Sequence, residues 1–133
     1  MPTEIQVETT TRVQFVDITA DVRRVIAGSG CESGLCHVYV PHTTAGLTVN
    51  EGADPDVTRD ILDQLEKLAP QGGRYRHSEG NADAHIRSAI VGISQLLPVR
   101  GGDLALGTWQ SVFFCEFDGP RSRRAIVSVT PAD

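Results

Sequence analysis

The chain has 133 residues, of which 40% are hydrophobic and 22% charged, and its formal net charge is −5. This length and composition predict one globular domain over residues 1–133. The acidic balance argues against a nucleic-acid partner, which would require a basic face. No apolar run approaches the roughly 20 residues of a membrane span, and the first residues show no signal-peptide pattern, so we expect a cytoplasmic protein without a membrane partner.

The first half of the chain shows the alternation of apolar and polar residues that is typical of strands. One short helix is expected within it, which Asp17 or Thr19 would cap and Gly28 would end. The expected strands lie around residues 5–7, 13–15, 36–40 and 45–51.

The second half begins with a clearer helix, which Asp54 caps, Pro55 starts and Pro70 stops. A loop follows, and Asn81 would then cap a further helix that ends at Gly92. The remaining residues predict strands over 95–99, 104–117 and 125–129, with a hairpin turn at 101–102. Together these elements predict an α+β fold, a mostly antiparallel β-sandwich-like domain with about three helices.

Three of the four histidines occur where elements end or begin. His42 follows a strand, His77 lies in a loop, and His85 is near the start of a helix. Three imidazoles around one divalent ion would form an ordinary catalytic zinc site with one open position. Each histidine on its own is more often a hydrogen-bonded structural residue, as we expect for His37, and the spacing matches no standard metal motif.

Four carboxylates accompany these histidines, namely Glu51, Glu79, Glu116 and Asp118. A carboxylate beside an imidazole can orient the ring or act as a general base. Glu116 is unusual because it follows an apolar run, and alternation places it on the same face as Val112 and Phe114. A carboxylate on an apolar face requires a partner, so Glu116 is the stronger candidate, whereas Glu79 is more simply a solvated loop charge.

Arginines crowd a turn near the C-terminus, at positions 121, 123 and 124. Arg121 and Arg123 are candidates for binding an anion, because guanidinium groups form paired hydrogen bonds with phosphate and carboxylate. The hydroxyls of Thr43 and Thr44, beside His42, would suit the same anion. A solvated turn that balances an acidic protein explains the same arginines equally well.

The cysteines and the single tryptophan are expected to be structural. Cys115 lies in an apolar run and predicts a buried, reduced thiol. Cys31 and Cys36 are close enough in sequence to pair, but nothing indicates an oxidising compartment. Trp109 is expected in the core.

Four segments in this order, HTTAGLTVNEGADPDV, YRHSEGNADAHI, LGTWQ and EFDGPRSRR, resemble the YjbQ family of small proteins. The resemblance covers about residues 13–129. It implies an α+β sandwich-like fold that assembles as a homotrimer, with pockets near the subunit boundaries.

The same resemblance implies a divalent metal, expected to be zinc, held by His42, His77 and His85. Glu51, Glu116 and Asn81 fall in the matching motifs and are the expected catalytic residues. The activity attributed to the family is a secondary thiamine-phosphate synthase reaction, in which a pyrimidine diphosphate joins a thiazole phosphate and pyrophosphate is released. A metal-dependent enzyme acting on a small phosphorylated molecule is therefore the leading hypothesis.

Two other classes of function stay open at this point. One is a non-catalytic module that binds or senses a phosphorylated metabolite. The other is a trimeric scaffold with a purely structural ion.

Overall fold

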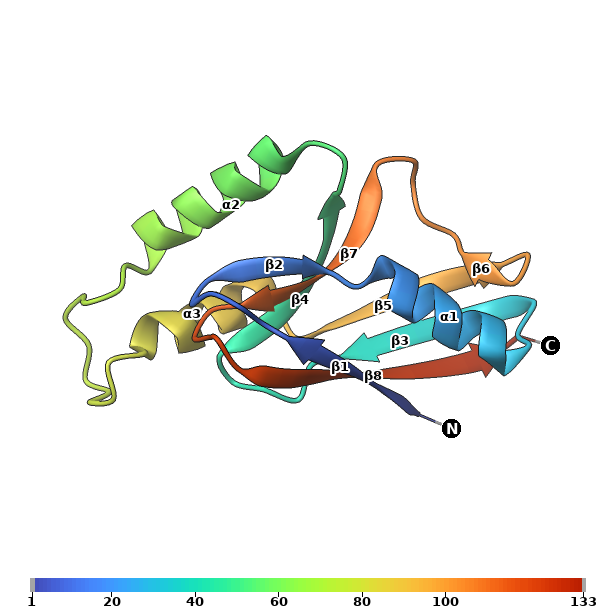
Figure 1. Cartoon of the computed structure of the whole chain (residues 1–133), viewed down its shortest axis with the longest axis horizontal. Helices are drawn as coiled ribbons and strands as arrows, with labels where there is room; N and C mark the ends of the chain where they lie inside the picture. Colours follow the sequence, from blue (N-terminus) through green and yellow to red (C-terminus); the bar gives the residue numbers. More distant parts are fainter. Residues whose placement is uncertain (1, 133) are drawn as a thin grey trace.

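The computed structural model describes residues 2–132, which form eight strands and three helices (Figure 1). The strands are β1 (Thr3–Glu8), β2 (Gln14–Asp17), β3 (Ser33–Tyr39), β4 (Ala45–Glu51), β5 (Ser94–Arg100), β6 (Asp103–Leu104), β7 (Gln110–Glu116) and β8 (Ser122–Pro131). The helices are α1 (Thr19–Ser29), α2 (Pro55–Leu68) and α3 (Ala82–Val91). The predicted α+β class with three helices is confirmed for this part of the chain.

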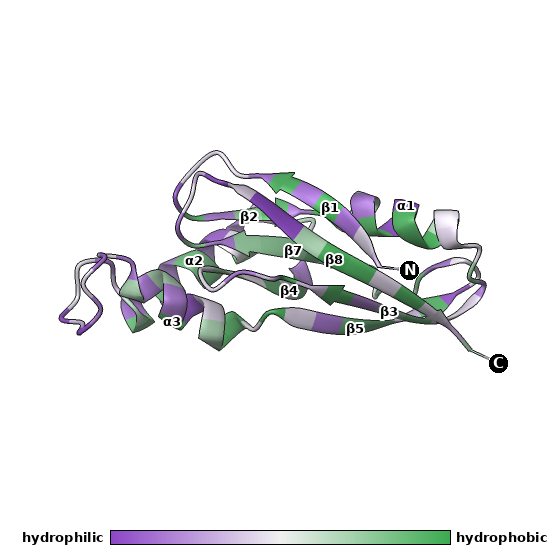
Figure 2. Cartoon of the chain, turned by 90° about the horizontal axis from the view of Figure 1, so that it is seen from below, coloured by the Kyte–Doolittle hydropathy of each residue, from purple (hydrophilic) through white to green (hydrophobic). Residues whose placement is uncertain are grey.

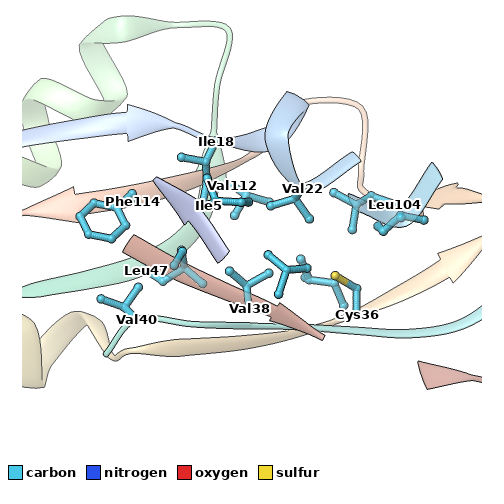
Figure 3. Packing of buried hydrophobic residues seen from close by; sticks show 14 of the residues in the cluster. Ile5, Ile18, Val22, Cys36, Val38, Val40, Leu47, Leu104, Val112 and Phe114 are labelled. Carbon is cyan, nitrogen blue, oxygen red and sulfur yellow. The ribbon is translucent and has the colours of Figure 1, made fainter. Parts of the chain in front are cut away.

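The strands form two sheets in which every pair is antiparallel. One sheet has five strands in the order β1-β8-β3-β5-β6, and the other has three in the order β2-β7-β4. The main hydrophobic core fills the space between them (Figure 3). Helix α1 packs against strands of both sheets, because its buried residues Val22 and Ile26 belong to the same core.

Strand β7 is buried on both faces, which explains its unbroken apolar sequence. Val112 and Phe114 belong to the core between the sheets, whereas Phe113 and Cys115 face a second cluster on the other side. That second cluster includes residues of α2 and α3, such as Leu65 and Ala84. The domain therefore has a helical layer, a three-stranded sheet and a five-stranded sheet (Figure 1).

Helix α3 lies very close to the start of β4. The Ser88 hydroxyl donates to the carbonyl oxygen of Ala45 at 2.6 Å. A side chain at Gly46 would place its Cβ only 2.6 Å from the carbonyl oxygen of Gly92, so this approach requires glycine. The contact fixes the last turn of α3 against the start of β4, and the first turns of α3 and the segment before β4 line the site described below.

Three local predictions were wrong. Helix α1 continues past Gly28 and ends at Ser29, followed by Gly30 in the left-handed region at φ 71°, and its N-cap is Ile18 without a side-chain cap. The stretch 104–117 is divided into β6 and β7 rather than forming one strand. Between them, Gly107 accepts from the N–H of Gln110, and this turn leaves Trp109 65% exposed instead of buried.

All three cysteines are buried and free, as expected for Cys115. Burial raises the pKa of the Cys36 thiol to about 11, with a smaller contribution from Cys31. Burial also raises the pKa of Cys115. The hairpin turn predicted at 101–102 is confirmed, with both glycines at positive φ between β5 and β6. Within residues 2–132, no helix is long and apolar enough to cross a membrane.

Candidate functional site

A polar pocket of about 370 Å³ lies where β4, α3 and β8 begin and β7 ends. Its lining comes from the segment before β4, the first turns of α3 with the loop before them, and the connection between β7 and β8. The lining residues are Pro41, His42, Thr43, Thr44, Glu79, Asn81, His85, Asp118, Arg121 and Arg123. The structure therefore gathers most of the residues predicted for the site, although they come from segments far apart in the sequence.

His42 is held in place by the backbone of β8. Its Nε2 accepts a hydrogen bond from the backbone N–H of Arg124 at 3.1 Å. Its ring lies edge-on to Phe114, with 6.3 Å between the ring centroids. Burial lowers the pKa of His42, and the positive charge of Arg123 lowers it further. His42 is therefore a fixed, neutral imidazole at neutral pH.

His85 and His77 form a pair at the other side of the pocket. Their rings meet edge to face with centroids 5.1 Å apart. His85 lines the pocket from α3, whereas His77 lies in the preceding loop, is not among the lining residues, and approaches Glu79 at 3.8 Å. The structure thus places His42 and His85 in one pocket, with His77 behind His85.

The three histidines do not form a metal site within one chain. Among residues 2–132, no three His, Cys, Asp or Glu side chains are grouped closely enough to hold a metal ion. In addition, the Nε2 of His42 is already occupied by the Arg124 N–H. The donor set that the resemblance implies for zinc therefore does not fit in this arrangement, and no step of the chemistry below passes through a metal.

Glu116 is fully buried, and every polar contact it needs is supplied from inside the protein. Its Oε1 accepts from the Thr9 hydroxyl at 2.8 Å and from Arg123 Nε at 2.9 Å. Its Oε2 accepts from Arg123 Nη2 and from the backbone N–H groups of Phe117 and Asp118, both at 3.1 Å. Glu116 thus ties the connection after β7 to β8 and to the end of β1.

These contacts also fix the charge of Glu116. Burial by itself would raise the pKa of Glu116, but the hydrogen bonds from Arg123, Thr9 and the Asp118 N–H outweigh it and hold the pKa below its ordinary value. The expectation that a carboxylate on an apolar face has a partner is confirmed by Arg123. A carboxylate with this many donors is poorly suited to exchange protons with a ligand.

Arg123 and Thr44 belong to the same internal network as Glu116. Arg123 is only 6% exposed, and its Nη2 donates to the Thr44 hydroxyl at 2.8 Å as well as to Glu116. Both residues line the pocket. The Thr44 hydroxyl and Arg123 Nε and Nη2 are engaged in the network, whereas Arg123 Nη1 forms no hydrogen bond within residues 2–132 and is not sealed from solvent, so the role of these two residues in binding an anion stays a prediction. Thr43 is exposed and stays available.

Arg121 is the accessible cation of the pocket. It is 53% exposed, and its guanidinium donates to Asp118 twice, from Nε to the carbonyl oxygen at 2.7 Å and from Nη2 to Oδ2 at 3.1 Å. A guanidinium has five N–H donors, so three of them remain free for a ligand. Arg121 thus keeps three donors for a ligand, whereas the only guanidinium nitrogen of Arg123 without a partner in residues 2–132 is Nη1.

Asp118 connects Arg121 to the start of α3. Its Oδ2 also accepts from the Asn81 amide at 2.9 Å. Burial would raise the pKa of Asp118, but the hydrogen bonds from Asn81 and Arg121 hold it below its ordinary value. Asn81 stands at the N-cap position of α3 as predicted, but its side chain bonds Asp118 instead of capping the helix.

Glu51 lies apart from this pocket in the single chain. It is at the far end of β4 from the segment that contains His42, and it lines a separate pocket of about 350 Å³ with Asp17 and Arg59. Its Oε2 accepts from the backbone N–H of Ala53 at 2.7 Å. One chain therefore gives no support for a shared role of Glu51 with the histidines.

Sequence reasoning missed the ion pair between Arg12 and Asp83. Arg12 donates from both Nη atoms to the two oxygens of Asp83, at 3.1 and 3.2 Å, and approaches Asp118 at 3.9 Å. Asp83 is 1% exposed and also pairs with the buried Arg87 at 3.5 Å. The spacing of Asp83 and Arg87 by four residues was the available signal, because it puts both on one helical face.

The sequence profile described as "UPF0047 protein YjbQ-like" matches residues 3–132. The chain belongs to the YjbQ/UPF0047 family.

Relatives of this YjbQ/UPF0047 chain are similar over nearly their whole length. The UPF0047 protein MJ1081 of Methanocaldococcus jannaschii is 48% identical, over 93% of this chain and 90% of the relative. The UPF0047 protein YugU of Bacillus subtilis is 46% identical, over 94% and 96%.

Solved structures of the family have the same fold. An uncharacterised YjbQ/UPF0047 protein from Clostridium acetobutylicum is 48% identical with a TM-score of 0.94, over 96% of this chain and 99% of that one. A hypothetical protein from Aeropyrum pernix is 40% identical with a TM-score of 0.94, over 99% of both chains.

Proposed function

We propose that the YjbQ/UPF0047 pocket binds a small phosphorylated molecule and that the protein is an enzyme acting on it. The observation that carries the proposal is the half-exposed guanidinium of Arg121 in one pocket with His42 and the exposed Thr43. Arginine with free paired donors is well suited to phosphate oxygens. Helix α3 also begins at this pocket without a side-chain cap, and a helix N-terminus favours an anion.

The reaction we propose is the one that the family resemblance implies. A pyrimidine diphosphate and a thiazole phosphate would combine to thiamine phosphate, with pyrophosphate as the leaving group. Arg121 and the start of α3 would stabilise the negative charge that develops on the leaving pyrophosphate. Asp118 would orient this Arg121, and its lowered pKa keeps it ionised for that purpose.

A divalent metal, expected to be zinc, enters the proposal only as an ion bound by His77 and His85 together with ligands from the substrate or a second copy of the chain. Metal analysis of the purified protein and of a His85→Ala variant tests this part. Equal metal content in both proteins would remove the metal from the proposal without affecting the anion site.

A second candidate function is a non-catalytic module that binds a phosphorylated metabolite. It is favoured by the state of Glu116, the buried carboxylate expected to move protons, because five donated hydrogen bonds saturate it. Measuring both product formation and ligand binding distinguishes the enzyme from the binding module. Tight binding without any product would favour the sensing module over the enzyme.

Self-association is also part of the proposal. Several large apolar side chains are exposed on β3, α3, β5 and the short link between α3 and β5, which run along one side of the domain (Figure 2). They are Leu35, Tyr39, Ile86, Ile90, Ile93 and Leu96. We propose that this surface is buried in a homotrimer, as the resemblance implies, because an extended apolar patch is a common sign of an interface. Light scattering gives the molar mass of the unaltered protein and of a Leu96→Glu variant. A monomeric mass for the unaltered protein would overturn the proposal.

Binding of inorganic pyrophosphate tests the anion site directly. Arg121→Gln should weaken binding at least tenfold in calorimetry, because a charge-assisted pair of hydrogen bonds is lost. Arg59→Gln is the matched control, since Arg59 also pairs with an aspartate three residues before it but lies outside this pocket. Equal affinity of the two variants would refute the proposed site.

A further inference from the structure

His42 occupies the place of a missing strand partner. The pairing of β3 with β8 ends at Tyr39 and Ile126. Beyond that point the chain turns through Pro41, so no backbone carbonyl of β3 continues along β8. The N–H of Arg124 donates instead to His42 Nε2 at 3.1 Å. The imidazole therefore takes the place of β3 beside this part of β8.

This hydrogen bond determines which ring nitrogen carries the proton. A nitrogen that accepts an N–H must have a free lone pair, so Nε2 is unprotonated and the neutral ring carries its hydrogen on Nδ1. Rotating the ring by 180° about χ2 would put a carbon against the Arg124 N–H and leave that donor without a partner. The geometry thus selects the Nδ1–H tautomer.

The protonated nitrogen is the one left for a ligand. Nδ1 forms no hydrogen bond with any residue from 2 to 132, and it is not one of the polar atoms sealed from solvent. The ring lines the polar pocket, and Arg121 and Thr43 are in the same lining. His42 therefore brings a neutral N–H donor to this pocket.

We infer that His42 donates a hydrogen bond from Nδ1–H to a phosphate oxygen of the bound molecule, and that it is neither a metal ligand nor a general base. The inference rests on the proposed function for the identity of the acceptor. A metal at Nδ1 would require the proton to move to Nε2, where it would face the Arg124 N–H with two donors opposed. A general base would need the Nε2 lone pair, which the backbone already uses.

Two measurements test the inference. Long-range nitrogen–proton NMR of histidine-labelled protein at pH 8 should show the Nδ1–H tautomer for His42 in the unaltered chain. Inorganic pyrophosphate is then titrated into His42→Gln and His42→Asn. The Gln amide reaches the position of Nε2, so its oxygen can still accept from Arg124 but its N–H₂ group does not occupy the position of Nδ1, whereas the Asn amide lies near Nδ1 and can still donate there.

We expect His42→Gln to bind pyrophosphate about tenfold more weakly than the unaltered chain, and His42→Asn to bind more tightly than His42→Gln. An Nε2–H tautomer, or equal affinities for His42→Gln and the unaltered chain, would overturn the inference while the proposed anion site survives. If the unaltered chain binds no pyrophosphate, the proposed function fails and the donor role fails with it. In that case the NMR result still shows whether the tautomer was assigned correctly.

Discussion

The network around Glu116 gives the sharpest prediction for stability. Glu116→Gln keeps the size of the side chain but removes its charge and turns an amide N–H₂ toward donors. Glu116 is 0% exposed and Arg123 6% exposed, so the arginine would stay buried without its counter-ion. Removing one partner of a buried ion pair costs about 3–5 kcal/mol, which is a large part of the roughly 5–15 kcal/mol that stabilises a domain. We expect a loss of about 3 kcal/mol at pH 7.

Urea unfolding followed by far-UV circular dichroism measures this loss. Glu4→Gln is the matched control, because Glu4 pairs with Arg124 at 2.8 Å but both side chains are about half exposed. Such a surface pair contributes less than about 1 kcal/mol. A loss for Glu116→Gln no larger than that of Glu4→Gln would refute the description of this network as a structural clamp.

The same substitution has a defined pH dependence. The folded pKa of Glu116 is lowered, so its contribution is complete above the ordinary unfolded value of about 4.3 and is lost as the pH falls through the lower folded value. The stability difference between the unaltered chain and Glu116→Gln should therefore be constant from pH 7 to about pH 5 and shrink in more acidic solution. A difference that grows toward low pH would contradict the sign of the shift.

The other predictions concern packing and burial. Gly46→Ala should destabilise by about 1–3 kcal/mol, because its Cβ would lie 2.6 Å from the Gly92 carbonyl oxygen. Gly28→Ala, in open space within α1, should stabilise the folded protein by about 0.5 kcal/mol. Urea unfolding of both glycine variants measures the difference, and equal effects on the free energy of unfolding would disprove it. Asp83→Asn removes the charge of a carboxylate that faces two arginines and should cost about 3 kcal/mol in the same assay; a loss under 1 kcal/mol speaks against a structural pair. A thiol reagent at pH 8 should label the cysteines of the folded protein only slowly, because all three are buried and the pKa of Cys36 is about 11. Rapid labelling before urea is added would contradict the burial of these thiols.

Local sequence signals predicted the elements well where a single residue determines the backbone. The Asp54 side chain accepts from the N–H of Asp56 at the start of α2, as a cap should, and Gly92 ends α3. The signals failed at Trp109, where a turn closed by Gly107 and Gln110 overrides the apolar character of the side chain.

The site could be predicted only in part, because its chemistry depends on which side chains use each other. Arg121 and Arg123 are indistinguishable in the sequence, yet one is half exposed and the other is buried on Glu116. Arg123, Ala125 and Val127 share the inward face of β8, whereas Arg121 precedes the strand, which begins at Ser122, and is therefore not held on that face. The sequence motifs identified the correct segments of the pocket. They did not reveal that His42 Nε2 accepts a hydrogen bond from the backbone of β8.

The anion site is the central claim, and mapping of backbone amide chemical shifts during a titration with inorganic pyrophosphate tests it most directly. The account predicts saturable changes that are largest at residues 42–44, at the first turn of α3 and at residues 118–121, which together line the pocket. Changes that are largest in the other hollows, such as the one between β1 and α1, or no saturable change at all, would contradict it.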